Sequence, residues 1–422
     1  MADRNAYYKP YREEILDRIR RFHFRRNASH EGRIFLISTT YPGYWLEHVY
    51  DSLVWAKLFP EDRDLPASQI RLFLENQRED GKLPAYILDN DLMNAQKRMS
   101  KAYTGQEIAP PGEFTVGYRQ LQECVSFASL CLETWEMNPE MDLAWIYECC
   151  CRWDAWLCRN RMTREMGLVE TFCGYDTGHD NSGRFAGIRY KGSPCSIPSD
   201  YPAGYPVDCE QAPLISPDVN AVFYGSRIAL AQMADHLGKT EEAADWQKRA
   251  SEVKHKLLDI CFDPETCFFY DVDKQDRKIP VKSISITNLF CEHVLDSNLA
   301  DTIYERYLAN PSEFGTPYGF PAVAVSDPTW VEDLDGNSWG FYSQGLVALR
   351  TLRWMPFYGR TEEMRRMMSA WLEAWCRPGV LKYGQELHPV TGEPSRCSQW
   401  YSSTMLYLIC AMKELELVTP VE

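Results

Sequence analysis

Apolar residues recur at helical spacing along almost the whole chain, whereas alternating apolar and polar runs are short and scarce. One apolar stripe runs from Val219 to Leu237 and stops at Gly238, and Thr240 then opens the next helix. Gly359 and Thr361 punctuate the chain in the same way. The spacing predicts an all-α protein of about a dozen helices, a number that suits paired helices stacked in a closed double ring.

The expected helices are separated by two unusually long connectors, which cover residues 78–117 and 185–217 and are rich in Gly, Pro, Tyr and Asp. Long irregular loops in a compact domain tend to carry function. No flexible linker, charge run or low-complexity tract divides the chain, so we expect one domain over residues 1–422 with these two connectors as loop insertions. The helices are expected at 7–24, 46–57, 68–77, 119–136, 143–159, 219–237, 240–261, 298–308, 336–354, 362–375 and 399–415.

The charge balance excludes several kinds of partner. Lys and Arg number 45 against 60 Asp and Glu, which gives a net charge of −15 and argues against nucleic acid or an anionic membrane. The first residues lack the apolar core of a secretion signal, and no apolar run approaches the roughly 20 residues of a membrane span. We therefore expect a cytoplasmic protein, whose 15 cysteines are mostly buried thiols rather than disulfides or zinc ligands.

Aromatic residues make up 13% of the chain, and many of them stand beside acids and amides in loops, as in residues 41–45, 330–333 and 398–401. Sugar rings stack their C–H faces on aromatic side chains, while their hydroxyls need polar partners. For any single aromatic residue, core packing is the more probable alternative. Taken together, they favour a small carbohydrate as the partner.

Two loop clusters could supply catalytic carboxyl groups. Residues 170–185 hold three acids, a histidine and an arginine among Gly and small polar residues, and residues 382–393 hold Glu386 before a Pro-x-Thr-Gly turn. Glycosidic cleavage needs a protonated carboxyl near the leaving oxygen and a second carboxylate across the sugar, and one acid from each cluster could meet this need. The first cluster could equally be a solvent-exposed turn. Asp176 competes with Asp180 for the acid role, and Glu393 competes with Glu386.

The run from Gly178 to Phe185 resembles the G-x-D-N-S-P-R-F loop of the inverting α-glycosidases of glycoside hydrolase family 63 and the related trehalases. The segment that starts at Glu386 is similar to their E-x-Y-x-P-x-T-G motif. Short bacterial members, such as mannosylglycerate and glucosylglycerate hydrolases, have about this length. Further matches follow in the family's order at residues 41–45, 77–84, 122–124, 216–220, 262–266, 314–317 and 400–402.

The resemblance implies an (α/α)6 barrel, with long aromatic loops over the active-site end, that hydrolyses with inversion and needs no metal or other cofactor. By position, Asp180 becomes the general acid and Glu386 the general base, and Asn181 and Arg184 would orient the acid or hold sugar hydroxyls. The implied activity is that of an exo-acting α-glucosidase on a small glucoside or disaccharide. The implied substrate-binding residues are Tyr44, Trp45, His48, Asp51, Gln77, Gln122, His179, Asn181, Arg184, Trp339, Trp400 and Tyr401.

Three positions depart from the family pattern. His48 stands where relatives have an aspartate, Gly183 replaces a proline, and the segment around Trp339 lacks the family's arginine. Two alternatives therefore stay open. One is a sugar isomerase or epimerase on the same barrel, with His48, His179 or His388 as the proton shuttle. The other is a carbohydrate-binding relative without catalytic activity.

Overall fold

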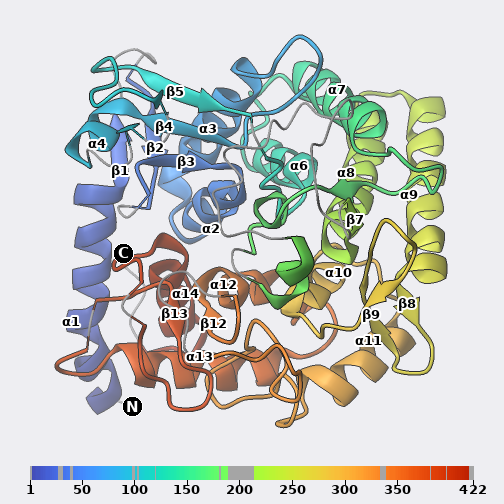
Figure 1. Cartoon of the computed structure of the whole chain (residues 1–422). Coiled ribbons are helices and arrows are strands. Elements are labelled where there is room, and N and C mark those ends of the chain that lie inside the picture. Colours follow the sequence, from blue (N-terminus) through green and yellow to red (C-terminus); the bar gives the residue numbers. More distant parts are fainter. Residues whose placement is uncertain are drawn as a thin grey trace.

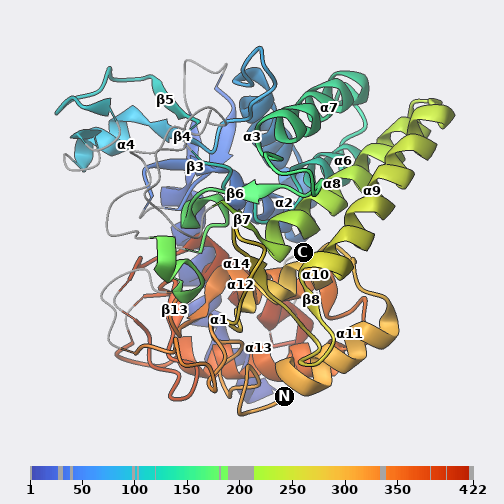
Figure 2. The same cartoon turned by 45° about the vertical axis from the view of Figure 1, so that its right-hand side comes forward.

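The computed structural model describes residues 2–26, 32–38, 41–96, 100–101, 104–118, 120–179, 182–188, 213–332, 339–380, 382–395 and 397–417. This part of the chain is mostly helical, as predicted, with several small sheets among the helices (Figures 1 and 2). The α-helices are α1 (Ala2–Arg18), α2 (Val49–Leu58), α3 (Asp64–Glu75), α4 (Asn90–Ala95), α6 (Phe127–Met137), α7 (Leu143–Asn160), α8 (Pro217–His236), α9 (Thr240–Ile260), α10 (Thr287–Cys291), α11 (Ser297–Ile303), α12 (Gly345–Trp354), α13 (Thr361–Trp375) and α14 (Ser402–Glu414).

Six of these helices contact one another in a closed series, in the order α2, α6, α8, α10, α12, α14 and back to α2. We call these six helices the ring. A second set packs outside it: α3 contacts α2 and α6, α7 contacts α6 and α8, α9 lies along α8, and α1 and α13 contact α14 (Figure 1). The chain thus alternates for most of its length between a ring helix and an outer helix.

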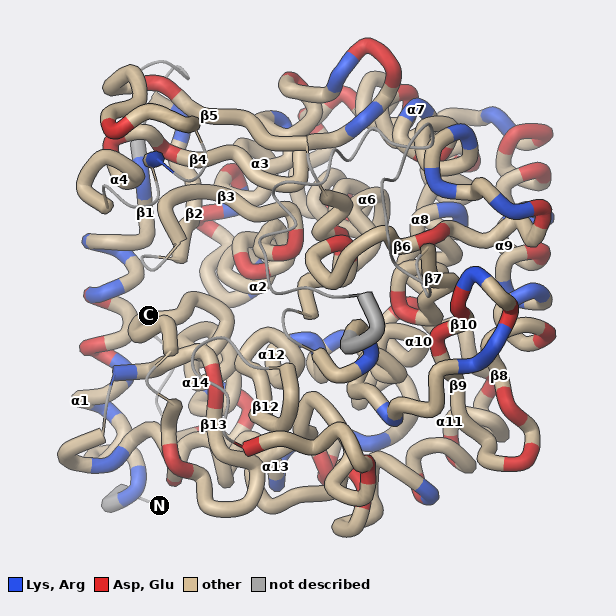
Figure 3. Tube along the Cα trace, in the orientation of Figure 1, with Lys and Arg blue, Asp and Glu red and all other residues tan. Residues whose placement is uncertain are grey.

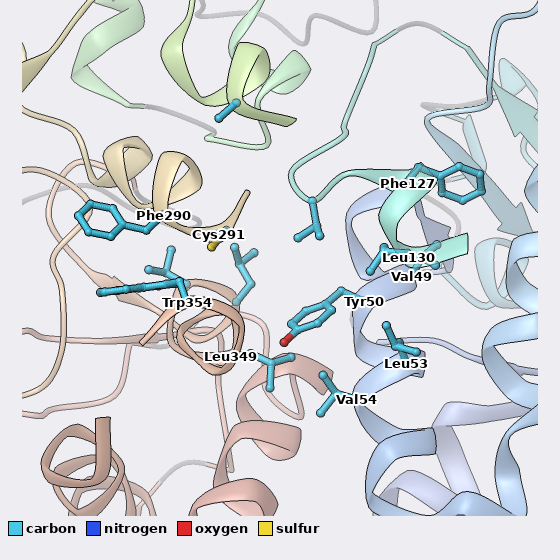
Figure 4. Close-up of a cluster of buried hydrophobic side chains, with 14 of the residues drawn as sticks. Val49, Tyr50, Leu53, Val54, Phe127, Leu130, Phe290, Cys291, Leu349 and Trp354 are labelled. Carbon is cyan, nitrogen blue, oxygen red and sulfur yellow. The ribbon is translucent and has the colours of Figure 1, made fainter. Parts of the chain in front are cut away.

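Burial patterns explain which helices take which layer. The outer helix α13 is amphipathic: Met364, Met368 and Trp371 are buried, whereas Glu362 and Arg366 face solvent. In the ring helix α14, every residue from Ser402 to Met412 is buried, and a helix without a polar face must be covered on all sides. Figure 4 shows apolar side chains of α2, α6, α10 and α12 meeting inside the ring.

Hydrogen bonds tie the starts of several ring helices to one another or to a neighbouring loop. Asp51 of α2 accepts hydrogen bonds from Ser402 and Ser403 at the start of α14. The backbone N–H of Gly345, the first residue of α12, donates to the carbonyl of Gln385. Asn288 of α10 donates to the carbonyl of Cys124, just before α6. These bonds join the start of α2 to that of α14 and the start of α10 to the residues before α6, and they fix the start of α12 beside Gln385. We call the end of the ring where these helices begin the site end.

Short antiparallel strands lead into several ring helices. Strand β3 (Gly43–Trp45) precedes α2 and pairs with β4 (Tyr86–Asp89), which in turn pairs with β5 (Phe114–Gly117). Strand β7 (Leu214–Ile215) precedes α8 and lies between β6 (Glu170–Thr171) and β10 (Asp271–Val272); β11 (Lys278–Ile279) pairs with β10, so β6 and β11 are the two edges of this sheet. Strand β12 (Ser343–Gln344) precedes α12 and pairs with β13 (Glu386–Leu387). Two further pairs join β1 (Phe24–Arg26) to β2 (Ile34–Leu36) and β8 (Phe262–Asp263) to β9 (Phe268–Phe269).

Four details of the predicted elements are wrong. The helix expected at 119–136 begins only at Phe127, because Gln122 has a φ of 55°, which a right-handed helix cannot contain. The helix expected at 336–354 begins at Gly345, because the two residues before it pair with Glu386 and Leu387 as a strand. Helix α10 was not expected. The connector 78–117 is not irregular, since it holds β4, α4 and β5; of the connector 185–217, residues 189–212 lie outside the described part.

No helix in the described part of the chain is both long and apolar enough to cross a membrane. The cysteines that the structure describes are all free thiols, and Cys149 and Cys150 are buried in α7, in agreement with a packing role.

Candidate active site

Glu386 lies at the site end of the ring, where the β12–β13 pairing fixes its position. Its side chain is completely buried. The strand register places Gln344 directly opposite Glu386, and Gln344 Nε2 donates a hydrogen bond to Glu386 Oε1 at 3.0 Å. Backbone pairing and a side-chain amide therefore hold one orientation of this carboxylate.

Aromatic side chains surround the residues next to Glu386. The Tyr41 hydroxyl donates to Gln385 Oε1 at 2.9 Å. The Tyr41 ring lies 6.0 Å from the ring of Trp45, and 6.2 Å from that of Tyr401. Because aromatic faces next to amide and carboxylate groups suit the two kinds of surface on a sugar, this corner of the site is suited to carbohydrate.

His48 is held between two carboxylates. Its Nδ1 lies 3.1 Å from Asp51 Oδ2, and its Nε2 lies 3.3 Å from Glu47 Oε1 and 3.4 Å from the Tyr401 hydroxyl. Burial alone would lower the pKa of His48, but Asp51 and Glu47 raise it to about 9. His48 is therefore a buried imidazolium at neutral pH, and Asp51 is occupied by His48 and by the two serines of α14.

Glu47 and Arg350 are site residues that the sequence reasoning missed. Glu47 Oε2 lies 3.5 Å from the Cys124 thiol, and a Cβ on Gly178 would come within 2.7 Å of the same oxygen. Arg350 is buried in α12. Burial would raise the pKa of Glu47, but His48 and the charge of Arg350 hold it below its ordinary value. Glu47 lies two residues after the aromatic motif at 41–45, which was the available signal; Arg350 lies in a helical stripe and gave none.

The acids of the first loop cluster have different places. Asp176 is buried against Arg161, with Nη1 of the arginine 2.6 Å from Oδ2 of the carboxylate. It also accepts hydrogen bonds from the backbone N–H groups of Leu121 and Phe172. Burial would raise the pKa of Asp176, but Arg161 lowers it. This carboxyl is a structural tie and not a proton donor. Asp180, together with Asn181, lies outside the described residues.

Arg184 is completely buried between two carboxylates. Its guanidinium binds Asp218 at 2.7 and 2.9 Å and Asp271 at 2.6 and 2.7 Å, and its remaining N–H faces His179 Nδ1 at 3.2 Å. All five N–H groups of Arg184 are thereby occupied. In this structure Arg184 is a clamp that anchors the loop that carries it to Asp218 and Asp271, and its expected role in orienting the acid or holding sugar hydroxyls stays a prediction.

His179 borders the same clamp. Burial lowers the pKa of His179 to about 3, so its ring is neutral and can accept a hydrogen bond from Arg184. The ring stacks on Trp339, with centroids 4.1 Å apart and planes 28° apart. The loop of residues 170–179 and the segment that leads into β12 are therefore packed together.

Residues 52–404 match the sequence model of the mannosylglycerate hydrolase MGH1-like glycoside hydrolase domain. The chain belongs to this family. The resemblance deduced from the loop motifs is thereby confirmed.

Solved structures of similar fold agree with the family. The GH63 mannosylglycerate hydrolase from Thermus thermophilus, in complex with glucose, superposes with a TM-score of 0.67 at 16% identity over 96% of this chain and 99% of that one. The neutral trehalase of Saccharomyces cerevisiae gives a TM-score of 0.62 at 12% identity over 91% of this chain and 74% of that one. An uncharacterized protein of Borreliella burgdorferi is 26% identical over 127 residues, which are 30% of this chain and 26% of that protein.

Three residues expected to bind substrate in this MGH1-like domain lie elsewhere. Tyr44 faces the core, where its ring lies 5.1 Å from Phe35. Gln77 binds the carbonyls of Gly81 and Cys149 and so ties a turn to α7. Trp400 lies under the guanidinium of Arg18 in α1, at 4.5 Å. The contacts of these three side chains therefore lie away from those of Glu386 and His48, and their role in substrate binding stays a prediction.

The other expected residues of the MGH1-like domain are connected by contacts at the site end. Trp45 is buried with its ring 4.8 Å from Tyr86 and 6.0 Å from Tyr41. Gln122 is buried, and its Oε1 accepts a hydrogen bond from Gln120 at 2.5 Å. The Gln122 side chain also hydrogen-bonds Glu47 and so helps to keep that carboxylate ionised. Contacts thus join the aromatic motif, residue 122 and the Glu386 segment.

The replacement of the family's proline by Gly183 has a steric reason. A Cβ at residue 183 would stand 2.6 Å from the Cβ of Thr329, a separation that real side chains do not tolerate. The loop therefore lies closer to the segment around Thr329 than any residue with a Cβ would permit.

Proposed function

We propose that this chain is an inverting α-glycoside hydrolase that removes a terminal sugar from a small α-glucoside or disaccharide. The ring and the helices outside it would form the inner and outer layers of an (α/α)6 barrel. The observation that carries the proposal is the placement of Glu386: a buried, oriented carboxylate at the site end, among aromatic and polar side chains, in a chain of a glycoside hydrolase family.

In the proposed mechanism, Glu386 is the general base. A water molecule held by its carboxylate attacks the anomeric carbon while Asp180, the general acid, protonates the leaving oxygen on the opposite side. The hydrogen bond from Gln344 favours the ionised carboxylate that a base requires. For inversion, the two carboxyl groups must stand about 6.5–9.5 Å apart, which leaves room for the water between base and sugar.

The burial of the polar side chains supports a small substrate and exo action. Glu47 and His48 expose only 12% and 7% of their side chains, and Tyr401 only 1%. Groups enclosed to this degree can contact the end of a sugar chain but not its middle. We propose that Glu47 and Arg350 provide the fixed charges of the sugar site, and that Arg350 replaces the arginine that is absent near Trp339.

The histidines argue against the isomerase alternative. A proton shuttle needs a pKa near the working pH. The pKa of His48 is raised to about 9 and that of His179 lowered to about 3. His388 Nδ1 faces the backbone N–H groups of Val390 and Thr391 at 3.2 and 3.3 Å, which places it in the turn as a structural acceptor.

The test compares two glutamates of one loop. Glu386→Gln should lower kcat by about 10²–10⁴-fold, the usual contribution of general base catalysis, without a change in melting temperature. Glu393→Gln is the matched control, because Glu393 lies on the same loop but is exposed, and it should leave kcat unchanged. Asp180→Asn should behave like Glu386→Gln. Ordinary turnover by Glu386→Gln would remove Glu386 from the mechanism.

A further inference from the structure

A cavity of about 500 Å³ lies at the end of the ring opposite the candidate active site. Its charged wall comes largely from the last turns of ring helices: Lys57 in α2, Arg353 in α12 and Lys413 in α14. The site end is formed by the first residues of the same helices. Lys57, Arg353 and Lys413 therefore lie a helix length away from the candidate active site, whereas Tyr50 reaches the cavity from the start of α2.

The charged side chains around the cavity are three cations and two carboxylates. Lys57, Arg353 and Lys413 line it, and the principal acid among them is Glu133, which binds Lys57 at 2.5 Å and Arg353 at 2.6 Å. The other lining acid, Glu414, is paired with an arginine of α13 at 2.8 Å. The lining thus carries a net excess of one positive charge on a chain whose net charge is −15, and this local sign favours an anion.

Two polar groups of the cavity have hydrogen-bonding capacity left over. Tyr50 is buried to all but 4%, and its hydroxyl has no hydrogen-bond partner among the described residues. Figure 4 shows this hydroxyl directed toward Val54 and Leu349 in the interior of the ring. The Arg353 guanidinium also lines the cavity, and among the described residues it hydrogen-bonds Glu133 through Nη1 alone. A bound acceptor could receive hydrogen bonds from both groups.

The cavity also has an apolar part. Val54, Leu58, Leu352 and Met368 line it next to the cationic groups. A few charged donors beside an apolar wall, in a volume of this size, are typical of sites for small organic ligands. An inorganic ion would leave the apolar wall without a contact.

We propose that this cavity binds a small organic anion. Its carboxylate or phosphate group would accept hydrogen bonds from Arg353, Lys413 and Tyr50, and its carbon skeleton would lie on the apolar wall. Lys57 is half exposed, at 50% of its side chain, and would stand at the entrance. The site is independent of the proposed hydrolytic activity.

Calorimetry with three probes tests the proposal. Glycerol 3-phosphate and lactate carry the two kinds of anionic group, and glycerol is the neutral control. We expect saturable binding of at least one anion and none of glycerol. The double variant K57Q/K413Q should weaken that binding about tenfold or more, since a hydrogen bond to a charged group contributes roughly 1.5–3 kcal/mol. Tyr50→Phe should weaken it by a smaller factor.

Two control variants test whether the anion occupies this cavity and not another part of the molecule. K239Q/K248Q removes the same charge from exposed positions at α9, and Glu386→Gln alters the candidate active site; both should bind the anion as the unaltered protein does. Equal binding by K57Q/K413Q and K239Q/K248Q, loss of binding in Glu386→Gln, or no saturable binding of either anion would overturn the proposal.

Discussion

Replacement of Arg184 by glutamine should destabilise the fold strongly and in a pH-dependent way. The Arg184 guanidinium is the shared counterion of two buried carboxylates, Asp218 and Asp271, with four hydrogen bonds between 2.6 and 2.9 Å. Glutamine keeps much of the volume of arginine but removes the charge. The variant therefore leaves two carboxylates buried beside each other without a cation.

The size of the loss follows from the cost of breaking a buried ion pair. Removal of one partner of such a pair costs about 3–5 kcal/mol, because the remaining charge stays desolvated. The two pairs share one cation, so their costs do not add in full. We expect the free energy of unfolding to fall by about 3–5 kcal/mol at pH 7, a large part of the 5–15 kcal/mol that stabilises an ordinary folded protein.

The sign of the pH dependence is fixed by the two carboxylates. In the unaltered protein, burial would raise the pKa of Asp218 but Arg184 lowers it, whereas burial and Asp218 raise the pKa of Asp271 despite Arg184. Without Arg184, both pKa values rise above those of the unfolded chain. The folded variant then binds more protons than the unfolded variant, so its stability increases as the pH falls from 7 toward about 4, the ordinary range of aspartate.

Urea denaturation at pH 7 and pH 5 measures both effects. The deficit of Arg184→Gln should be smaller at pH 5 than at pH 7. Arg365→Gln is the matched control, because Arg365 exposes 41% of its side chain and pairs with Glu362 and Glu414 at the surface; its loss should stay below about 1 kcal/mol at either pH. A loss in Arg184→Gln no larger than that of the control, or one that does not change with pH, would refute the reasoning.

Three further predictions concern the site end. The stability that His48 contributes is present below its unfolded pKa of about 6.5 and is lost as the pH rises toward its folded pKa of about 9. The difference in melting temperature between the unaltered protein and His48→Gln should therefore shrink over that pH range. A constant difference would contradict the ion pairing of His48 with Asp51 and Glu47. Gln344→Leu removes the donor to Glu386 and should move the acidic limb of the kcat/KM profile to higher pH by about one unit; an unmoved limb would mean that this hydrogen bond does not tune the base. Gly183→Ala should lower the free energy of unfolding by about 1–3 kcal/mol, because the added methyl group overpacks against Thr329. In a Thr329→Gly background the same change should lower it much less, as measured by urea denaturation. Equal losses in the two backgrounds would exclude that clash.

The helical spacing predicted most of the fold because long amphipathic and apolar stripes are local features. It failed where distant residues decide the local conformation. The start of α12 depends on a strand pairing with residues more than 40 positions later along the chain, and α10, with five residues, is too short to show a period.

Part of the candidate site could be found from motifs, and part could not. The Glu386 segment and the aromatic run at 41–45 were found because their spacing is typical of the family. The clamp around Arg184 could not be found, because its two carboxylates come from 34 and 87 positions later in the chain. Trp400 and Tyr401 face opposite ways, toward α1 and toward His48. Only the packing of α1 and α14 decides which of the two lies in the site.

Proton NMR of the first product tests the central claim most directly. A panel of α-linked gluco, manno and galacto disaccharides and glycosyl glycerates would be incubated with the protein, and the anomeric signals of the released sugar followed before mutarotation. Attack by water on the face opposite the leaving group predicts that the β-anomer accumulates first. Initial release of the α-anomer, or no free sugar from any member of the panel, would contradict the account.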